Sequence, residues 1–514
     1  MKNNRWIAAL LCLCMALGLA ACGTDDGQTN SGSSVAGVNS GSSGETPAAK
    51  TEFALAYSAE DTLHPFTLQS AVNMDLMTLL YDPLVKLDQN FVLQNCIAES
   101  VSVSGTACRV AVKSGLVFSD GSPLTAADVA YSLDAAREGG SYYKNRLENV
   151  SAVQATGTHT LEITLKSADA LFANNLDVPI FKKDSDVNAM PVGSGRYQYA
   201  NDEAGAKLVA NPKWYGEPKP GFAEIPLRDV PDNDALLYSL KLGKISYMFA
   251  SSTEGETSNV GSSSMPVTTN SFVFLGLNSQ SGVFRDKALR RAVNMAVDKD
   301  SLVTNGFSGH GVKTGLPLNP KYPFMSENAG VNIHYPDEEV AAAFEAAGYT
   351  RDGNTWKKNG AALSVRLLLS SGNSEREQAA RELSEMLKKQ GVEVTVESKD
   401  YDAYLSALKN GEFDLYLGEI KLTNDLDLSP FFSLSGAASY GIQTGGAVSA
   451  AYAAFRADTA QLDAFQKAFL EETPFIPLMF RNGVIAFSRS ISGEMQASVS
   501  DIFYNIEQWQ VPAA

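Results

Sequence analysis

The chain has 514 residues and a formal net charge of −17, with 44% hydrophobic and 19% charged residues. These proportions are ordinary for a globular protein, and the length exceeds what one compact core supports, so two or three subdomains are expected. A surface this acidic argues against nucleic acid or anionic lipid as a general partner.

The chain begins with a predicted secretory signal peptide, residues 1–21. Lys2 and Arg5 give it a basic start, and the uncharged run that follows is shorter than the about 20 residues that a membrane-spanning helix needs. The run ends in Leu-Ala-Ala-Cys at 19–22, which resembles the lipobox of bacterial lipoproteins. We therefore expect a lipid on Cys22. An ordinary signal peptide followed by a chance cysteine is the alternative.

The segment from Cys22 to residue 51 is expected to be a flexible tether. It consists mostly of Gly, Ser, Thr, Asn and Asp and holds no aromatic residue. Such a segment buries too little apolar surface to offset the entropy lost on ordering. A coil of this length spans roughly 30 Å, which would let a folded body move next to a membrane surface.

The folded body is expected to alternate between strands and helices. A strand is predicted over 53–57, followed by a helix that ends at Tyr81. Thr125 and Asp128 have the spacing of a capping box, which predicts a helix starting at this point. Apolar residues recur at helical spacing over 288–297 and predict a helix that faces a core.

Cys96 and Cys108 are the two cysteines beyond the N-terminal region, in a compartment where a disulfide is permitted. Alternating runs on either side of Ser104–Gly105 predict a hairpin with its turn there. This register places Cys108 opposite Val101, five residues from Cys96. At about 3.3 Å per residue that separation is beyond disulfide reach. We therefore expect two free, buried thiols rather than a bridge.

The clearest architectural signal is a βαβ unit with a parallel sheet. A strand over 363–369 precedes a helix capped by Ser374, and an alternating strand follows from Val392. A second helix, 401–409, leads to another buried strand over 413–418. Ligands of open α/β sheets bind beyond the carboxyl ends of strands, so the acidic loop after this last strand is predicted to hold a binding site.

Six segments resemble, in order, motifs of the family 5 extracellular solute-binding proteins, the dipeptide-, oligopeptide- and nickel-binding components of ABC importers. The resemblance runs from about residue 52 to the C-terminus. The segments are LLYDPLVKLD at 79–88, VFSDGSPLTAADVAYSL at 117–133, PVGSGRYQY at 191–199, NPKWYG at 211–216, FLGLNSQSGVFRDKALRRAVNMAVDKDSL at 274–302, and 378–420.

The resemblance implies an α/β, two-lobed, periplasmic-binding-protein-like fold of class II type, with an extra α+β subdomain in lobe one. Lobe one would comprise 52–269 and 485–514, with 89–190 as the inserted subdomain, and lobe two would comprise 270–484. A ligand between the lobes would stabilise the closed state through its higher affinity for that state. No bond would be made or broken, so neither catalysis nor a cofactor is expected.

The resemblance also implies a function. A lipid-anchored monomer at the outer face of the cytoplasmic membrane would capture short peptides and deliver them to an ABC permease. The same fold could instead bind a nickel chelate, haem or another small solute. A secreted hydrolase and a sensory binding protein are alternatives of other classes, although no G-x-S-x-G, H-E-x-x-H or phosphate-cradling motif is present.

In peptide-binding relatives, an aspartate in the loop after this second-lobe strand pairs with the ligand's α-ammonium group. Here the loop offers Asp425 and Asp427, with Glu419 at its start, and a buried carboxylate facing an ammonium group forms a charge-assisted pair. Relatives often have a tryptophan after the glycine, whereas Glu419 follows Gly418. The alternative is that Asp425 or Asp427 caps a short helix near Ser429.

On the first lobe, His64 lies in the loop that matches the family's first ligand-facing loop, and packing or a backbone contact is its alternative role. Tyr142 and Tyr143 precede a turn where relatives bring aromatic residues to the cleft, with core burial of at least one as the alternative. No metal site is predicted, because the histidines have no pair at ligand spacing. They are His64, His159, His310 and His334.

Overall fold

The computed structural model describes residues 52–138, 142–185, 190–231, 233–251, 263–326 and 334–511. The predicted signal peptide, lipidated Cys22 and tether lie outside these residues. Within the described ranges, no helix combines the length and the apolar character needed to cross a membrane.

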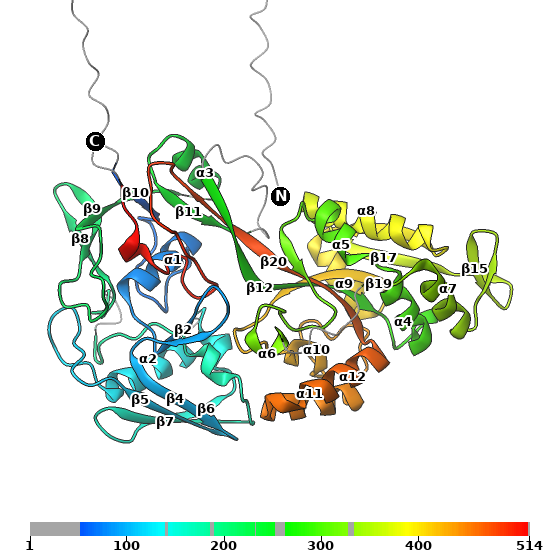
Figure 1. Cartoon of the computed structure of the whole chain (residues 1–514), viewed down its shortest axis with the longest axis horizontal. Coiled ribbons are helices and arrows are strands. Elements are labelled where there is room, and N and C mark those ends of the chain that lie inside the picture. The colour runs from blue at the N-terminus through cyan, green and yellow to red at the C-terminus, as the bar shows by residue number, and fades with distance from the viewer. Residues whose placement is uncertain are drawn as a thin grey trace, which may run out of the picture. The chain divides into compact units, whose positions relative to one another are not determined.

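A four-stranded sheet with helix α1 packed against it forms the base of the first lobe (Figure 1). Strand β1 pairs in parallel with β10, and β9 and β8 continue the sheet in antiparallel fashion. Ser70 caps α1 by accepting a hydrogen bond of 3.4 Å from the Asn73 amide, and the helix ends at Tyr81 as predicted. The bounds are β1 Leu55–Tyr57, α1 Ala71–Leu80, β8 Tyr197–Asp202, β9 Gly205–Ala210 and β10 Glu224–Asp229.

A second antiparallel sheet, in the order β4-β5-β7-β6, lies within the predicted inserted subdomain and packs against helix α2. The predicted helix start is confirmed with one half of the capping box, because Asp128 Oδ2 accepts hydrogen bonds from the Thr125 amide at 2.8 Å and from its hydroxyl at 2.7 Å, while the Asp128 amide donates to the Thr125 carbonyl. The bounds in this region are β2 Val85–Leu87, β3 Leu93–Asn95, β4 Ala98–Ser104, β5 Ala107–Val112, α2 Ala126–Glu138, η1 Lys144–Leu147, β6 Val150–Ala155, β7 Thr160–Leu165 and η2 Phe172–Asn175.

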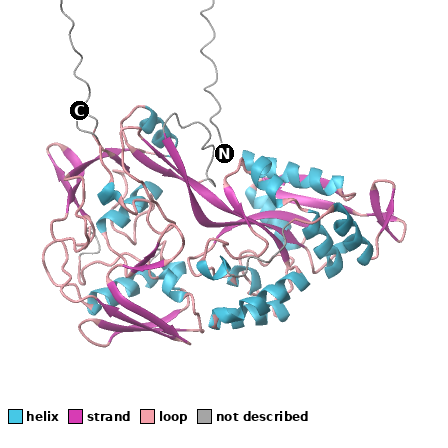
Figure 2. Cartoon of the chain, in the orientation of Figure 1, coloured by secondary structure: helices cyan, strands magenta, loops and turns pink. Residues whose placement is uncertain are grey.

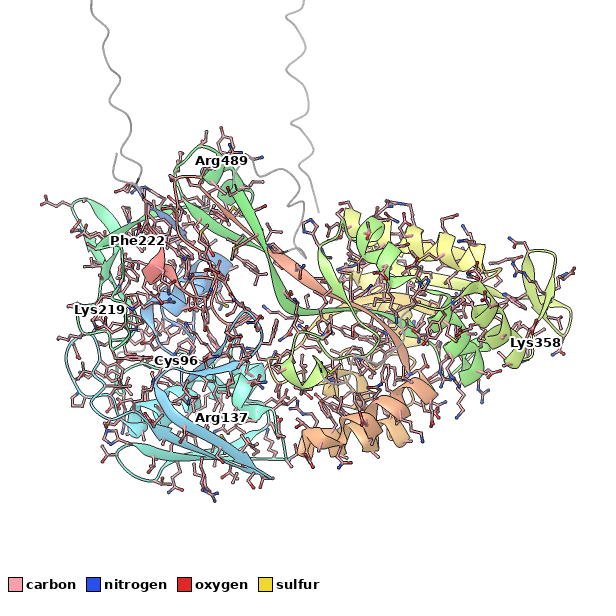
Figure 3. All side chains as sticks on the ribbon, in the orientation of Figure 1. Cys96, Arg137, Lys219, Phe222, Lys358 and Arg489 are labelled. Carbon is pink, nitrogen blue, oxygen red and sulfur yellow. The ribbon has the colours of Figure 1, made fainter. Side chains whose placement is uncertain are left out.

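The β4–β5 hairpin differs from the predicted one by one residue at its turn. Gly105 and the residue after it form the turn, and Gly105 has a φ of +59°, which glycine adopts without steric cost. Cys108 therefore lies opposite Val103 rather than Val101, so the predicted register is wrong. Cys96, labelled in Figure 3, and Cys108 are both free and buried, as expected.

Two long antiparallel strands, β12 and β20, run from one lobe into the other (Figure 1). Beside the first lobe β20 pairs with β11, and within the second lobe β12 pairs with β19. The pairing of β12 with β20 is irregular between Thr268 and Phe272, and irregularities of this kind bend strands. The predicted lobe boundaries after 269 and 484 fall inside these strands and stay predictions. The bounds are β11 Tyr247–Ala250, β12 Ser263–Leu277, β13 Gly311–Lys313 and β20 Phe475–Phe487.

The predicted βαβ unit is confirmed in the second lobe. Strand β17 pairs in parallel with β18 on one side and with β19 on the other. The cap of α8 is Asn373 rather than Ser374, because the Asn373 side chain accepts from the Arg376 amide at 2.8 Å. The bounds are β17 Ser364–Ser370, α8 Ser374–Lys389, β18 Glu393–Lys399, α9 Tyr401–Asn410 and β19 Leu415–Lys421.

Helices gather around the sheet of the second lobe, as Figure 2 shows. The predicted helix within 288–297 is confirmed as α4, whose buried face includes Leu289 and Val293. The remaining elements are α3 Asn233–Lys241, η3 Val283–Arg285, α4 Lys287–Ala296, α5 Lys299–Ser301, η4 Leu302–Gly306, α6 Pro323–Ser326, α7 Asp337–Ala346, β14 Thr350–Asp352, β15 Thr355–Lys358, β16 Ala361–Ala362, α10 Ser429–Phe432, α11 Ala447–Ala457, η5 Thr459–Gln461, α12 Leu462–Glu472 and η6 Ile506–Gln508.

Buried apolar residues form separate cores for the two lobes. One core joins side chains from 53–267 with those of the C-terminal return, 485–509. Two others are built from residues within 272–480, and Leu87 and Phe91 also pack into one of these. Because burial of apolar surface is the main stabilising contribution in folding, each lobe has its own source of stability.

Candidate functional site

A cavity of about 790 Å³ lies between the two lobes. The first lobe contributes α1, the turn from Tyr142 to Arg146 and the loop 498–502, and the second contributes β19. Strands β11, β12 and β20 also line it, together with residues of α3, Arg376 of α8 and Asp177. The volume falls within the about 300–1,000 Å³ that is typical of small-molecule sites.

Part of the first-lobe wall of the cavity is apolar, although α1 also brings Asp75 and Thr78 to it. Helix α1 contributes Met74 and Met77, and β11 contributes Met248 and Phe249. Methionine side chains are flexible and polarisable, so they adapt to partners of different shape. This wall therefore suits apolar groups of varied size.

Glu419 lines the cavity from β19, and its charge is compensated within the protein. Its Oε1 accepts a hydrogen bond of 3.0 Å from Ser271 Oγ. Its Oε2 lies 3.3 Å from Arg376 Nη2 and 3.7 Å from Arg481 Nη1. Two guanidinium groups and a hydroxyl thus hold a mostly buried carboxylate at the cavity wall, as a buried charge requires.

Tyr142 and Lys421 meet at the cavity from different lobes. Lys421 Nζ donates a hydrogen bond to the Tyr142 hydroxyl and lies 5.0 Å from the centroid of its ring. The Arg146 guanidinium lies 5.5 Å from the same ring. Partial burial raises the pKa of Tyr142, but the nearby charges of Arg146 and Lys421 outweigh it, and the pKa is lowered overall. The phenol therefore lies in a positive electrostatic potential.

Arg146 and Asp177 form an ion pair beside these groups, and both line the cavity. Asp177 Oδ2 also accepts a hydrogen bond of 2.7 Å from Asn424 Nδ2 in the loop after β19. The Asp177 side chain is buried and the Arg146 side chain is mostly buried, and each of the two charges compensates the other. This contact ties the loop after β19 to the first lobe.

Asp425 lies behind the cavity wall and is not among the residues that line it. Its carboxylate pairs with Arg456 Nη2 at 2.6 Å and accepts a hydrogen bond from Thr423. Its amide donates to Asn175 Oδ1 at 3.1 Å. The residue is 3% exposed, and burial opposes ionisation, but Arg456 and these hydrogen bonds keep its pKa lowered. The charge of Asp425 is therefore satisfied by the protein itself.

Asp427 also contacts the protein and does not line the cavity. Its Oδ1 accepts hydrogen bonds of 2.9 Å from the Ser429 amide and from the Tyr452 hydroxyl. The Ser429 amide belongs to the first residue of α10, so Asp427 satisfies a donor at a helix start. The N-cap residue itself is Leu428, so Asp427 supports the start of α10 from one residue before the cap position that the sequence left open as its alternative.

His64 is buried outside the cavity lining. Its Nδ1 accepts a hydrogen bond of 3.2 Å from the Phe66 amide, and its ring meets Phe181 edge-on at 5.7 Å between centroids. Burial lowers its pKa. The packing role and the backbone contact that the sequence left open for His64 are both present.

Tyr143 is buried and also lines the cavity. Its ring contacts the ring of Phe66.

Several residues at the cavity were not singled out from the sequence. They include Arg146, Arg376 and Lys421 and the loop 498–502. One signal could have found Lys421, because it lies two residues after Glu419 on the same strand, and such residues point to the same face. No local pattern marks Arg376 or the C-terminal loop, since chain segments far apart in sequence bring them to the site.

Comparison with known proteins places the chain among extracellular binding proteins. Residues 92–440 match the family model of bacterial extracellular solute-binding proteins, family 5 middle. The oligopeptide-binding protein AppA of Bacillus subtilis (strain 168) is 26% identical over 566 aligned positions, covering 99% of this chain and 99% of that protein. The glutathione-binding protein GsiB of Escherichia coli (strain K12) is 26% identical over 268 positions, covering 48% of this chain and 52% of that protein.

Solved structures share the fold. AppA from Bacillus subtilis in complex with a nonapeptide has a TM-score of 0.59 at 22% identity, covering 90% of this chain and 99% of that one. NikZ from Campylobacter jejuni in complex with Ni(L-His) has a TM-score of 0.62 at 20% identity, with coverages of 90% and 99%. The two-lobed α/β fold of class II type that the sequence predicts is thereby confirmed.

Proposed function

Since this chain belongs to the family 5 bacterial extracellular solute-binding proteins, we propose that it captures short peptides between its two lobes and delivers them to an ABC permease. The observation that carries this proposal is the cavity of about 790 Å³ between the lobes. It combines an apolar wall from α1 and β11 with polar groups from β12 and β19, such as Ser271 and Glu419. Few precisely placed polar groups within an apolar lining are typical of sites that bind and orient small ligands.

The choice of peptides rests on two supports. The relative that matches 99% of this chain is named an oligopeptide-binding protein. The cavity has the size of a site for a drug-sized molecule, which favours peptides of a few residues. Binding without reaction is the activity proposed, and closure of the lobes would follow from the ligand's contacts with both.

We assign ligand contacts to Glu419 and Tyr142, since both were predicted from the sequence and both line the cavity. The direct contacts predicted for Asp425, Asp427 and His64 stay predictions, and their present partners are protein groups. Variants of Glu419 and Asp425 distinguish a ligand contact from a contact within the protein.

The proposal includes the lobes and the anchor expected from the sequence. Lobe one would comprise 52–269 and 485–514 with its insert at 89–190, and lobe two 270–484. A signal peptide cut before a lipidated Cys22 would hold a monomer at the outer face of the cytoplasmic membrane. Labelled fatty acid should be incorporated into the parent and not into Cys22→Ala, whose release from the membrane fraction would support the anchor.

Equilibrium dialysis against a mixed library of dipeptides to nonapeptides, followed by mass spectrometry, tests the function. We expect short peptides to be retained and recovered with unchanged mass. Nickel–histidine, haem and a glycan mixture serve as separate arms. Retention of one of these without any peptide, or the appearance of cleaved peptides, would contradict the proposal.

A further inference from the structure

The charges at the β19 end of the cavity are paired with one exception. Glu419 is compensated by Arg376 and Arg481, and Asp177 by Arg146. Lys421 lines the same region, and among the described residues no carboxylate lies within ion-pair distance of its Nζ. Its contact there is the hydroxyl and ring of Tyr142. Lys421 is exposed, so its ammonium group is accessible to a group from outside the protein.

The environment of Tyr142 is also suited to a negatively charged group of a ligand. Its side chain is 40% exposed, so a ligand in the cavity can reach it. Arg146 and Lys421 together lower the pKa of its phenol against the opposing effect of burial. A potential that favours phenolate at this point also favours the carboxylate of a ligand.

We propose that Lys421 Nζ and the Tyr142 hydroxyl form a subsite for a carboxylate group of the ligand. A tyrosine hydroxyl that accepts a hydrogen bond from lysine keeps its own O–H to donate, so the two groups can bind one carboxylate together. Both hydrogen bonds would be charge-assisted, and these are the stronger kind. Because the two residues come from different lobes, the bound carboxylate would also bridge the lobes.

This subsite rests on the proposed function, since a peptide supplies a carboxylate at its C-terminus or on an acidic side chain. The two aspartates predicted to offer a partner for the ligand's ammonium group have protein partners instead, Asp425 with Arg456 and Asp427 with Ser429 and Tyr452. Recognition on this side of the cavity would therefore depend on the negative end of the peptide.

Three tripeptide libraries test the proposal by dialysis and mass spectrometry. One has free C-termini, one has C-terminal amides without Asp or Glu, and one has C-terminal amides with Asp or Glu. We expect the parent to bind free acids about 10- to 100-fold more tightly than amides without acidic residues, as one or two hydrogen bonds to a charged group would produce. Retention of the third library with loss of the second would identify a side-chain carboxylate as the source.

The variants Lys421→Met and Tyr142→Phe should lose most of this preference for free acids. The variant Lys421→Arg, which keeps the positive charge, should retain part of it. Lys388→Met, on the exposed face of α8, is the matched control and should behave like the parent. Thermal unfolding verifies that each variant is folded. If the parent binds acids and amides equally, or if Lys421→Met keeps the preference, the subsite is wrong while peptide binding stands. If the parent retains no library, the proposed function fails and the subsite falls with it.

Discussion

The guanidinium of Arg456 on α11 donates a hydrogen bond to the carboxyl group of Asp169, which lies between β7 and η2. The backbone repeats the connection, because the Ala170 amide donates to the Arg456 carbonyl at 2.6 Å. Arg456 also forms an ion pair with Asp425, so one guanidinium contacts two buried carboxyl groups. By the proposed boundaries Asp169 belongs to lobe one and Arg456 to lobe two. These contacts therefore connect the two lobes.

Replacing Arg456 with methionine should strongly destabilise the protein. The change would leave the charge of Asp425 buried without a compensating cation and remove a hydrogen bond to Asp169, which costs about 3–5 kcal/mol of unfolding free energy. Urea unfolding followed by fluorescence measures the difference. Arg109→Met is the matched control, because Arg109 forms an exposed pair with Glu162 and its loss should cost less than about 1 kcal/mol. Equal effects of the two variants would contradict a fastening role for Arg456.

Stability should fall with rising pH through the titration of Asp169. Burial and the neighbouring Asp425 carboxylate raise the pKa of Asp169 to about 8, although Arg456 acts in the opposite direction. The unfolded chain loses this proton near pH 4, so between about pH 4 and 8 the folded state binds more protons and its stability decreases as pH rises. The contribution is fully present below about pH 4 and is lost by about pH 8.

The variant Asp169→Asn tests this assignment, because an amide imitates the protonated acid and does not titrate. Unfolding free energies measured from pH 5 to 9 should decline less steeply in the variant than in the parent, by up to about 1.4 kcal/mol per pH unit. The charged groups around the position are Arg456, Asp425 and, next to the guanidinium, Asp427. Parallel curves for parent and variant would show that Asp169 is ionised throughout.

Glu419→Gln should weaken peptide binding more than it lowers the free energy of unfolding, because Glu375 still pairs with Arg481 and the side chain of Arg376 is partly exposed to water. Glu419 lines the cavity and holds Ser271 and Arg376 in place. The side-chain amide of the glutamine would disturb these contacts and reduce the binding free energy of the ligand by about 1–3 kcal/mol. Isothermal titration with a retained peptide measures the change. Asp425→Asn should have the reverse profile, lowering unfolding free energy more than affinity, because its partners are Arg456 and Thr423. A larger loss of affinity in Asp425→Asn than in Glu419→Gln would support the ammonium contact predicted from the sequence.

Cys96 and Cys108 should resist alkylation in the folded protein. Both thiols are free, and burial raises the pKa of each to about 12, so almost no thiolate is present at neutral pH. Iodoacetamide treatment without a reductant, followed by peptide mapping, should label neither residue in buffer and both in concentrated denaturant. Failure to label them in denaturant would indicate a disulfide and contradict the free state.

Local patterns in the sequence were enough for much of the fold. The βαβ unit from β17 to β18 and the hydrogen bond from the Thr125 amide to the Asp128 side chain depend on residues near one another in the chain, and both are present. Predictions failed where two local solutions compete. Asn373 caps α8 although Ser374 is also a good cap, and the hairpin turn uses Gly105 with the following residue rather than with the preceding one.

By itself the sequence determined the α/β class, the family-like order of motifs and the acidic loop after β19 as a place to look for a site. Only the tertiary structure decided what the side chains of that loop do. Asp425 meets Arg456, which is 31 residues away, and the same guanidinium reaches Asp169, which is 287 residues from it. Helical and strand periodicity is set by neighbouring residues, whereas the partner of a buried charge is set by which distant segments pack around it. That is why Glu419 and Lys421 are left facing the cavity while Asp425 is held inside the protein.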